Sequence, residues 1–287
     1  NRAVRTVVRE LNGSCATTAA MGRLWMRSAV LNLVSIDAVL EGAFCAPDRP
    51  VVIAASGPTL ARCIPDIARF RDLVELWALP SAATALAAAG LQPDLVILSD
   101  PGHWAMVHLH FAGVRCPVAM PLSAARGTWR VGEPVRLLNQ GTFLERELLA
   151  AVGVEAPLAE PHGTVAATAL ELALAATRGP VTLAGLDLCA LDSETHVRPN
   201  AFDALLRDGD GRCAPHHALA YDRARLGESG SRIVGGVRVR VSRSLETYAG
   251  WLSHRASAVR GRLFRLHPSP VDLPGADPVD GARFGVL

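Results

Sequence analysis

The chain has 287 residues, half of them hydrophobic and a fifth charged, which is enough apolar sequence to bury one large core. Its formal net charge is only +2, and arginines alternate with acidic residues, which argues against a surface that follows a nucleic-acid backbone. Lysine is absent, so all 29 Lys and Arg positions are arginines. The absence of lysine excludes the usual P-loop and pyridoxal phosphate chemistries, because both require that side chain.

Cysteine usage points to a reducing compartment. The six cysteines, at positions 15, 45, 63, 116, 189 and 213, form no CxxC pair and mostly lie in apolar segments. This spacing favours reduced thiols in the cytoplasm over a zinc site or a disulfide framework. No run approaches the roughly 18 apolar residues of a membrane span, and no signal peptide is recognisable. The chain begins with Asn1 instead of Met, so the sequence leaves open whether a further segment precedes it.

The predicted elements begin with a helical arm, because apolar residues recur at helical spacing through residues 1–44. From Val51, short apolar runs alternate with amphipathic stretches, a pattern typical of strands and helices around a parallel sheet. Pro65 should interrupt the first core helix, because it has no N–H to donate. Strands are predicted at 50–55, 73–79, 94–99, 116–120, 134–138 and 180–185, and helices at 59–71, 81–90, 103–112, 142–152 and 164–177.

The pattern loosens after Ala190, where a polar, glycine-containing region precedes a helix predicted at 243–260. The alternation in residues 237–241 favours a half-exposed strand over a nucleic-acid-binding patch. The last twenty residues, rich in Pro, Gly and Asp, predict an extended tail that packs on another part of the chain. Together these features predict an α/β fold with a doubly wound, mostly parallel, Rossmann-like sheet, divided into a helical arm (1–44), a nucleotide-binding core (45–200) and a C-terminal extension with a helix and an irregular tail (201–287).

The first candidate site is the turn Ser56-Gly57-Pro58-Thr59, which follows a buried strand and opens a helix. Glycine lets the backbone approach a ligand closely, and proline suits the first helical position. The N–H groups freed at a helix N-terminus favour an anion such as a phosphate. Because the full GxGxxG pattern is missing, an ordinary strand-to-helix turn explains this segment equally well when it is taken alone.

Two aspartates end later strands of the predicted sheet. Asp100, followed by Pro101, ends the third strand, and Asp187 comes shortly after Gly185 at the end of the sixth. Ligands of open parallel sheets bind beyond the carboxyl ends of the strands, so we expect both carboxylates in one crevice with the first turn. They would bind a hydroxyl or a metal ion there, although a helix-capping role for Asp100 is equally compatible with the sequence.

Two further segments complete the candidate crevice. Gly163 and Thr164 open an apolar helix and offer backbone N–H groups and a hydroxyl, although a capping threonine alone also explains them. His196 lies in a polar loop after the sixth strand and is the preferred residue for proton transfer, with an exposed loop histidine as the simpler alternative. No metal site is predicted, because no spacing typical of a ligand set joins a carboxylate to His103, His108, His110, His216 or His217.

Four segments, in this order, resemble the Maf family of bacterial flagellin glycosyltransferases and the related archaeal 6-hydroxymethylpterin pyrophosphokinase-like domain. They are ASGPTL at 55–60, GLQPDLVILSDP at 90–101, HGTVAATALELAL at 162–174 and AGLDLCALDSETH at 184–196. The resemblance implies a core similar to that of a group of bacterial sialyltransferases. For Maf members it also implies transfer of a nonulosonic sugar from its CMP derivative to flagellin, and hence a role in motility. Leu186 departs from the family pattern, where glutamine is frequent, which leaves the donor, the acceptor and the activity itself open.

Three hypotheses follow from the motifs and the resemblance together. In the first, a glycosyltransferase, residues 56–59 and Thr164 hold the nucleotide phosphate of a CMP-sugar, Asp100 and Asp187 orient hydroxyls, and His196 assists proton transfer without an obligatory metal. In the second, a pyrophosphokinase, the two aspartates hold Mg²⁺ against the phosphates of ATP while a hydroxymethylpterin is the acceptor. In the third, the protein is a non-catalytic nucleotide- or sugar-binding partner in flagellar or surface-polysaccharide assembly.

Overall fold

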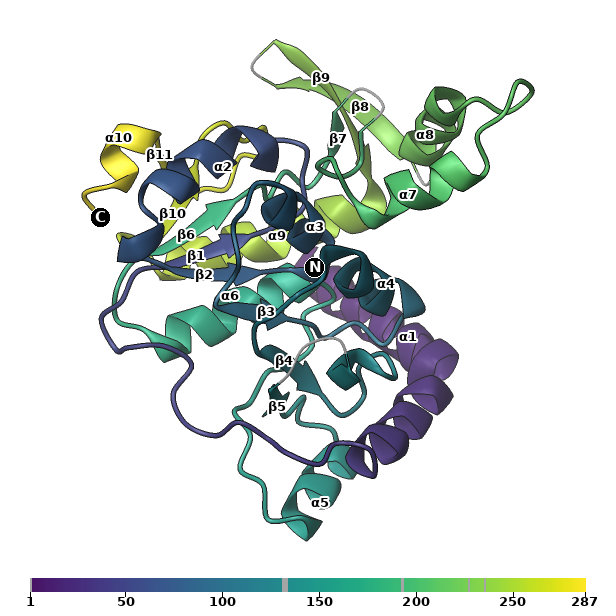
Figure 1. The fold of residues 1–287 in the computed structure, drawn as a ribbon, viewed down its shortest axis with the longest axis vertical. Coiled ribbons are helices and arrows are strands. Elements are labelled where there is room, and N and C mark those ends of the chain that lie inside the picture. Colours follow the sequence, from purple (N-terminus) through teal and green to yellow (C-terminus); the bar gives the residue numbers. More distant parts are fainter. Residues whose placement is uncertain (1, 131–133, 192–193, 227, 235) are drawn as a thin grey trace.

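A computed structural model describes residues 2–130, 134–191, 194–226, 228–234 and 236–287. Within these ranges an eight-stranded parallel sheet has the order β11-β10-β6-β1-β2-β3-β4-β5 (Figure 1). Its strands are β1 (Val51–Ala54), β2 (Glu75–Ala78), β3 (Leu95–Ile97), β4 (Val118–Pro121), β5 (Val135–Leu138), β6 (Val181–Ala184), β10 (Leu263–Leu266) and β11 (Asp277–Val279). The predicted fold class and all six predicted strands are confirmed.

The central strand β1 shows why the chain folds this way. It lies between β6 and β2 and is buried on both faces, as its uninterrupted apolar sequence predicts. Val52 and Ala54 belong to the core on one face of the sheet, while Val51 and Ile53 belong to the core on the other. This alternation follows from the two-residue period of a strand.

Helices cover both faces of the sheet (Figure 1). Leu60, Leu86 and Leu109 fill the core beneath one helical layer, and Leu170 and Leu252 fill the core beneath the other. The first layer contains α2 (Leu60–Arg69), α3 (Pro80–Ala88) and α4 (His103–Ala112), and the second contains α6 (Val165–Ala176) and α9 (Arg243–Ala258). The helices predicted for these segments and for α5 (Phe143–Ala151) are therefore confirmed.

The prediction that Pro65 interrupts the first core helix is wrong, because α2 continues through it. A proline inside a helix removes one backbone hydrogen bond and crowds the preceding turn. Leu60, Cys63 and Ile67 are fully buried on the sheet side of α2. Burial of such side chains contributes roughly 1.5–3 kcal/mol each, which is enough to offset the local cost of the proline.

Beyond β6 the chain builds a small lobe that lies to one side of the sheet (upper right in Figure 1). A three-stranded antiparallel sheet with the order β7-β9-β8 packs there with two helices. The half-exposed strand predicted at 237–241 is confirmed, since Val239 and Val241 are buried while Arg238, on the opposite face, is exposed. The lobe contains β7 (Ala190–Leu191), α7 (Ala201–Asp208), α8 (His216–Arg225), β8 (Glu228–Val234) and β9 (Val237–Ser242).

The C-terminal residues return to the main sheet instead of remaining irregular. They add β10 and β11 beside β6, followed by the short helix α10 (Gly281–Phe284). Val271 and Leu273 are buried, and the Phe284 ring packs edge-on against Phe70 at 5.8 Å. The region 201–287 thus supplies one edge of the central sheet and most of the small lobe, whose strand β7 comes earlier in the chain.

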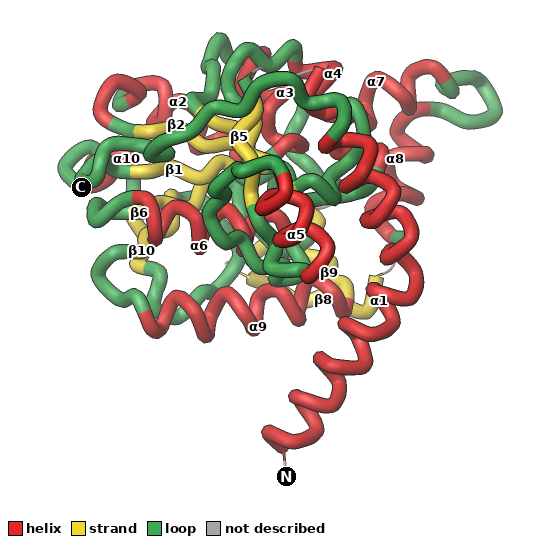
Figure 2. The backbone as a smooth tube through the Cα atoms, turned by 90° about the horizontal axis from the view of Figure 1, so that it is seen from below, coloured by secondary structure: helices red, strands yellow, loops and turns green. Residues whose placement is uncertain are grey.

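The N-terminal arm contains one long helix, α1 (Arg2–Leu33), which is shorter than the predicted helical arm because residues 34–44 form no helix. The first half of α1 projects away from the body of the molecule (Figure 2). Its end is fastened to the core by Asn32, whose side-chain amide donates to the carbonyl oxygens of Leu122 and Ala124 at 2.8 and 3.1 Å. Among the helices of the described residues, none is long and apolar enough to cross a bilayer.

Candidate functional site

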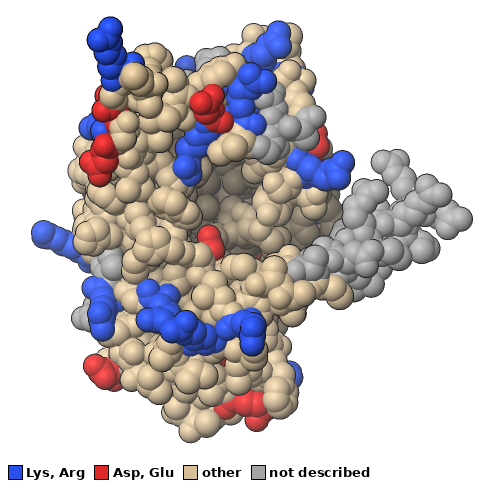
Figure 3. All heavy atoms as spheres, turned by 90° about the vertical axis from the view of Figure 1, so that its right-hand side faces the viewer, with Lys and Arg blue, Asp and Glu red and all other residues tan. Residues whose placement is uncertain are grey.

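A cleft of 460 Å³ opens at the carboxyl ends of the central strands, where the small lobe faces the sheet. Figure 3 shows this face of the molecule hollowed, with arginine side chains gathered around the hollow. The predicted crevice therefore exists. Its lining includes Ser56, Gly57, Asp100, Thr164, Gly185, Asp187 and His196 from the sequence-based set, whereas Pro58, Thr59, Pro101 and Gly163 do not line it.

Thr59 and Asp187 bind each other inside the protein. The Thr59 backbone N–H donates to Asp187 Oδ2 at 2.8 Å, and its hydroxyl donates to Asp187 Oδ1 at 2.5 Å. Asp187 is only 1% exposed, and this burial raises the pKa of its carboxyl group, against the opposing effect of the bonds from Thr59. The carboxylate thus occupies the N-terminus of α2, where we expected a phosphate. The expected phosphate-binding role of Thr59 disagrees with this geometry.

Gly57 and Gly185 are required by the close crossing of the turns that follow β1 and β6. The Gly57 N–H donates to the Gly185 carbonyl oxygen at 2.7 Å. A Cβ on Gly57 would lie 2.5 Å from that oxygen and would overlap the Asp187 carboxylate. Gly185 has a φ of +63°, and a Cβ there would lie 2.6 Å from Leu60 Cβ. These glycines and the Thr59–Asp187 pair hold the floor of the cleft in place.

The Thr59–Asp187 pair gives a direct test of this arrangement. We expect Thr59→Val and Asp187→Ala each to lower the free energy of unfolding by about 1–3 kcal/mol, because each leaves a buried polar partner unsatisfied. Urea denaturation of the two single variants and the double variant should show a coupling energy of about 0.5–3 kcal/mol. For Thr247→Val, at an exposed position of α9, the change in the free energy of unfolding should instead be additive with that of Asp187→Ala. Strict additivity for Thr59 and Asp187 would contradict the assigned pair.

Asp100 lies before helix α4, which begins at His103, and remains exposed at the cleft. Its Oδ1 accepts a hydrogen bond from the Gly102 N–H at 2.7 Å, and its carbonyl oxygen accepts one from the Ala125 N–H at 3.1 Å. The capping alternative foreseen for Asp100 is wrong, because Gly102 is the N-cap residue of α4 and no side chain caps that helix; the Asp100 carboxylate instead closes a local turn with the Gly102 N–H. Because Asp100 is exposed where it lines the cleft, it also remains available to a ligand hydroxyl.

The N-terminus of α6 opens into the same cleft. Thr164 is its N-cap residue, but the threonine hydroxyl makes no capping hydrogen bond. Val165 and Ala166 also line the cleft, and their N–H groups belong to the first turn, which has no intrahelical acceptor. Gly163, with a φ of +80°, lies against the ring of Tyr248 from α9. The sequence predicted anion binding at the N-termini of α2 and α6. Of these two, α6 offers an anion the better set of free N–H donors.

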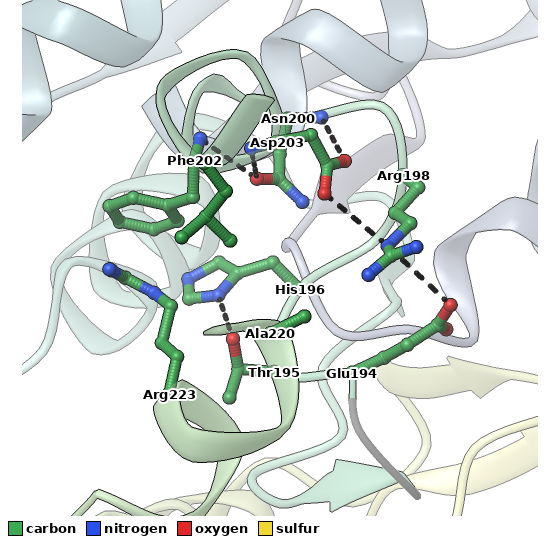
Figure 4. Close-up of a pocket in the computed structure, with 10 residues that line it drawn as sticks. Glu194, Thr195, His196, Arg198, Asn200, Phe202, Asp203, Ala220 and Arg223 are labelled. Carbon is green, nitrogen blue, oxygen red and sulfur yellow. Dashed lines mark hydrogen bonds and ion pairs between the residues drawn. The ribbon is translucent and has the colours of Figure 1, made fainter. Parts of the chain in front are cut away.

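His196 belongs to a compact aromatic cluster on the lobe side of the cleft, and Figure 4 shows it with Phe202 and Arg223 in a smaller adjoining pocket. Its ring stacks on His108 from α4 at 6.2 Å and packs against Phe202 from α7 at 5.2 Å. The Arg223 guanidinium lies 3.4 Å from the centre of the Phe202 ring. His196 Nδ1 is 2.9 Å from the Thr195 hydroxyl. These contacts fix the position of the imidazole at the cleft wall.

Burial keeps this histidine pair neutral. Burial, and then the charges of His108 and Arg223, lower the pKa of His196 to about 4. Burial, and then the charge of Arg223, lower the pKa of His108 to about 4 as well. At neutral pH both rings are therefore uncharged, which is the form in which an imidazole accepts a proton. A nearby ligand anion would strengthen His196 as a base, because it would favour the imidazolium.

An ion-pair network lies behind the aromatic cluster and orients the start of α7. Arg198 lies 3.4 Å from Asp203 and 3.7 Å from Glu194 (Figure 4). Asn200 and Asp203 form a capping box, in which each side chain accepts from the backbone N–H of the other residue. This arrangement fixes the position of Phe202, which supports His196.

Sequence reasoning missed several residues that line the cleft, among them Trp104, His108, Tyr248 and Arg240. Trp104 and His108 had a usable signal, because they lie on the helix that begins directly after Asp100. Tyr248 and Arg240 come from the C-terminal region, whose packing no local pattern indicates. In the ranges that the structure describes, no group of three or more His, Cys, Asp and Glu side chains is placed to hold a metal ion.

Comparison with known proteins shows the family. A profile of the 6-hydroxymethylpterin diphosphokinase MptE-like family matches residues 28–193. The chain belongs to this family. The match contains the turn at 56–59, Asp100, Thr164 and Asp187, but it ends before His196 and most of the small lobe. The MptE-like assignment agrees with the resemblance drawn from the four sequence segments.

Two individual proteins are also similar to this MptE-like chain. An uncharacterized protein of Treponema pallidum (strain Nichols) is 28% identical over 262 residues, which cover 91% of this chain and 54% of that protein. The chain therefore spans about half the length of this relative. The structure of the MAf glycosyltransferase from Magnetospirillum magneticum AMB-1 superposes with a TM-score of 0.61 at 18% identity, over 89% of this chain and 38% of that one. The two proteins share the fold.

Proposed function

We propose that the protein is a cytoplasmic glycosyltransferase that uses a nucleotide-activated sugar. The observation that carries this proposal is the cleft, which combines free helix N–H groups, an exposed carboxylate and a neutral histidine in one space of 460 Å³. Pockets for small molecules and cofactors have about this size. The resemblance to Maf proteins supports a CMP-activated nonulosonic sugar as the donor and a protein hydroxyl, such as one on flagellin, as the acceptor.

In this reaction the α6 N-terminus binds the phosphate of the donor. The N–H groups of Val165 and Ala166 and the Thr164 hydroxyl stabilise the negative charge that develops on the departing nucleotide. The acceptor oxygen forms a bond to the anomeric carbon while the bond from that carbon to the phosphate oxygen breaks. His196 takes the proton of the acceptor hydroxyl. Asp100 accepts a hydrogen bond from a hydroxyl of the ligand.

Asp187 acts through the protein in this scheme and does not contact the reacting atoms. Its two carboxylate oxygens hold Thr59 and so fix the turn that contains Ser56 and Gly57. Ser56 remains at the cleft surface, where its hydroxyl accepts a hydrogen bond from Ser81 at 2.8 Å. Asp187 is therefore a positioning residue, which revises the catalytic role expected from the sequence.

The family name supports a second candidate, a pyrophosphokinase dependent on Mg²⁺ and ATP. Its metal would need both Asp100 and Asp187 as ligands. The residues do not fit that requirement as they are arranged, because both oxygens of the buried Asp187 already accept hydrogen bonds from Thr59. The geometry therefore favours the glycosyltransferase. The third, non-catalytic candidate rests on Leu186, an apolar residue of the cleft wall.

A ligand panel tests the proposal by thermal unfolding. We expect CMP to raise the Tm by several degrees whether or not Mg²⁺ is present, since a ligand at 100 times its Kd adds about 2.7 kcal/mol to the free energy of unfolding. Thr164→Val should reduce this shift, because it removes a phosphate donor. Thr247→Val, at an exposed position of α9, should leave it unchanged.

The other outcomes of the panel separate the three candidates. Stabilisation by ATP only in the presence of Mg²⁺ would favour the pyrophosphokinase. No response to CMP, a CMP-sugar, ATP or GDP would overturn both enzyme candidates. Release of CMP from a CMP-sugar in the presence of a flagellin acceptor, with sugar found on the acceptor by mass spectrometry, would establish the transfer itself.

A further inference from the structure

Trp104 is the largest side chain that lines the cleft, and it is unusually exposed for an indole. It lies in the first turn of α4 and is 48% exposed. Phe111, on the same helix, is similarly exposed at 47% but lies outside the cleft. A large aromatic surface inside a concave site is available to bury against a ligand, which a scattered surface aromatic is not.

The indole of Trp104 is supported from behind by the aromatic cluster. It lies 5.2 Å from the Phe202 ring at an interplanar angle of 57°. Phe202 is buried and packs edge-on against His108 at 4.8 Å. The hydrogen bond from the Gly102 N–H to Asp100 fixes the start of α4 just before Trp104. The ring therefore needs little reordering to bind a ligand.

The cleft is divided into two chemical parts. Hydroxyl and carboxylate groups of Ser56, Ser81, Asp100 and Thr164 line it near the carboxyl ends of the central strands and the N-termini of α3 and α6. The rings of Trp104, His108, His196 and Phe202 form a contiguous aromatic group beside them, while Tyr248 from α9 lines the cleft against Gly163. A ligand that fits both parts has a hydroxylated and phosphorylated portion joined to a flat apolar portion.

We propose that Trp104 stacks on a planar heteroaromatic ring of the ligand. A planar heteroaromatic ring can stack on the indole over its whole face, while the hydroxyls of the ligand find their polar partners in the other part of the cleft. Under the proposed function, on which this assignment rests, the ring is the nucleobase of the sugar donor. A pterin presents the same chemistry, so the experiment must separate these two sources.

Isothermal titration calorimetry with CMP, ribose 5-phosphate and 6-hydroxymethylpterin tests the stacking. Loss of one aromatic stacking partner typically weakens binding of a base roughly tenfold or more. We therefore expect Trp104→Leu to weaken CMP binding by roughly tenfold or more and to leave ribose 5-phosphate unaffected. Trp104→Phe should retain most of the CMP affinity. Phe111→Leu is the matched control and should retain all of it.

Each result separates the stacking from the proposed function. Undiminished CMP binding by Trp104→Leu, or an equal loss for CMP and ribose 5-phosphate, would overturn the stacking and leave a nucleotide-dependent function intact. Pterin binding that depends on Trp104, without CMP binding, would support the stacking and overturn the glycosyltransferase. Binding of neither CMP nor the pterin to the unsubstituted protein would overturn both.

Discussion

Gly57→Ala should lower the free energy of unfolding by roughly 2–4 kcal/mol, more than the average single substitution. The added Cβ would lie 2.5 Å from the Gly185 carbonyl oxygen and would overlap the Asp187 carboxylate. Neither neighbour can move freely, because the carbonyl oxygen accepts from the Gly57 N–H and the carboxylate is held by Thr59. Urea denaturation monitored by circular dichroism measures the effect.

Gly250→Ala is the matched control for Gly57. Gly250 lies inside helix α9, and a Cβ there would meet no heavy atom within 4 Å. Alanine at such a position should stabilise the helix by roughly 0.5–1 kcal/mol. If Gly57→Ala were instead as stable as the unsubstituted protein, the close crossing between the turns after β1 and β6 would be wrong. CMP binding by the folded fraction of Gly57→Ala would then show whether the turn also contributes to the ligand site.

The central sheet was predictable because its strands are buried on both faces. β1 and β6 consist almost wholly of apolar residues, and each ends in a glycine-containing turn, so local sequence alone defines them. The strands β10 and β11, of which β11 forms the edge of the sheet, were missed for the opposite reason. They have four and three residues, β11 contains Pro278, and they form only by pairing beside the distant strand β6.

The sequence predicted where the candidate site lies better than it predicted the chemistry of the residues there. Strand ends of a parallel sheet must converge, so the sequence could bring Gly57, Asp100 and Asp187 to one edge. It could not show that the Asp187 carboxylate points inward to Thr59. This contact joins two segments 128 residues apart in the chain, and it depends on how closely the fold brings them together. The aromatic side of the cleft combines residues from α4, α7 and the lobe, whose contacts are non-local.

One local signal in the lobe was present and was overlooked. Asn200 and Asp203 stand three residues apart, the spacing of a helix-capping pair, and they do begin α7. Recognising that helix would have placed Phe202 one residue inside it and close to His196 in the chain. The pairing of His196 with His108, by contrast, needs the fold, since no pattern relates the two positions.

Acid should destabilise the protein through this histidine pair, and His108→Gln should remove part of the effect. The pKa of His108 is lowered from 6.5 to about 4 by burial and by Arg223, so the unfolded chain binds a proton at higher pH than the folded protein does. The stability contribution of the neutral ring is therefore complete above pH 6.5 and is lost as the pH falls towards about 4. For His108 alone the loss amounts to about 3 kcal/mol.

The measurement is the free energy of unfolding in urea at pH values from 8 down to 4, because the slope identifies the group that titrates. Between pH 6.5 and 4, the free energy of unfolding of His108→Gln should fall less steeply with decreasing pH, by the slope that corresponds to about one bound proton. This comparison of slopes holds whatever the difference in stability between the variant and the unsubstituted protein at pH 8. Thr247→Val, which changes no titratable group and lies at an exposed position of α9, should leave the slope unchanged. An unaltered slope in His108→Gln would mean that the pKa of His108 is the same in the folded protein and in the unfolded chain. Burial would then not hold this ring neutral below pH 6.5, and the explanation given for the neutral histidine pair would be wrong.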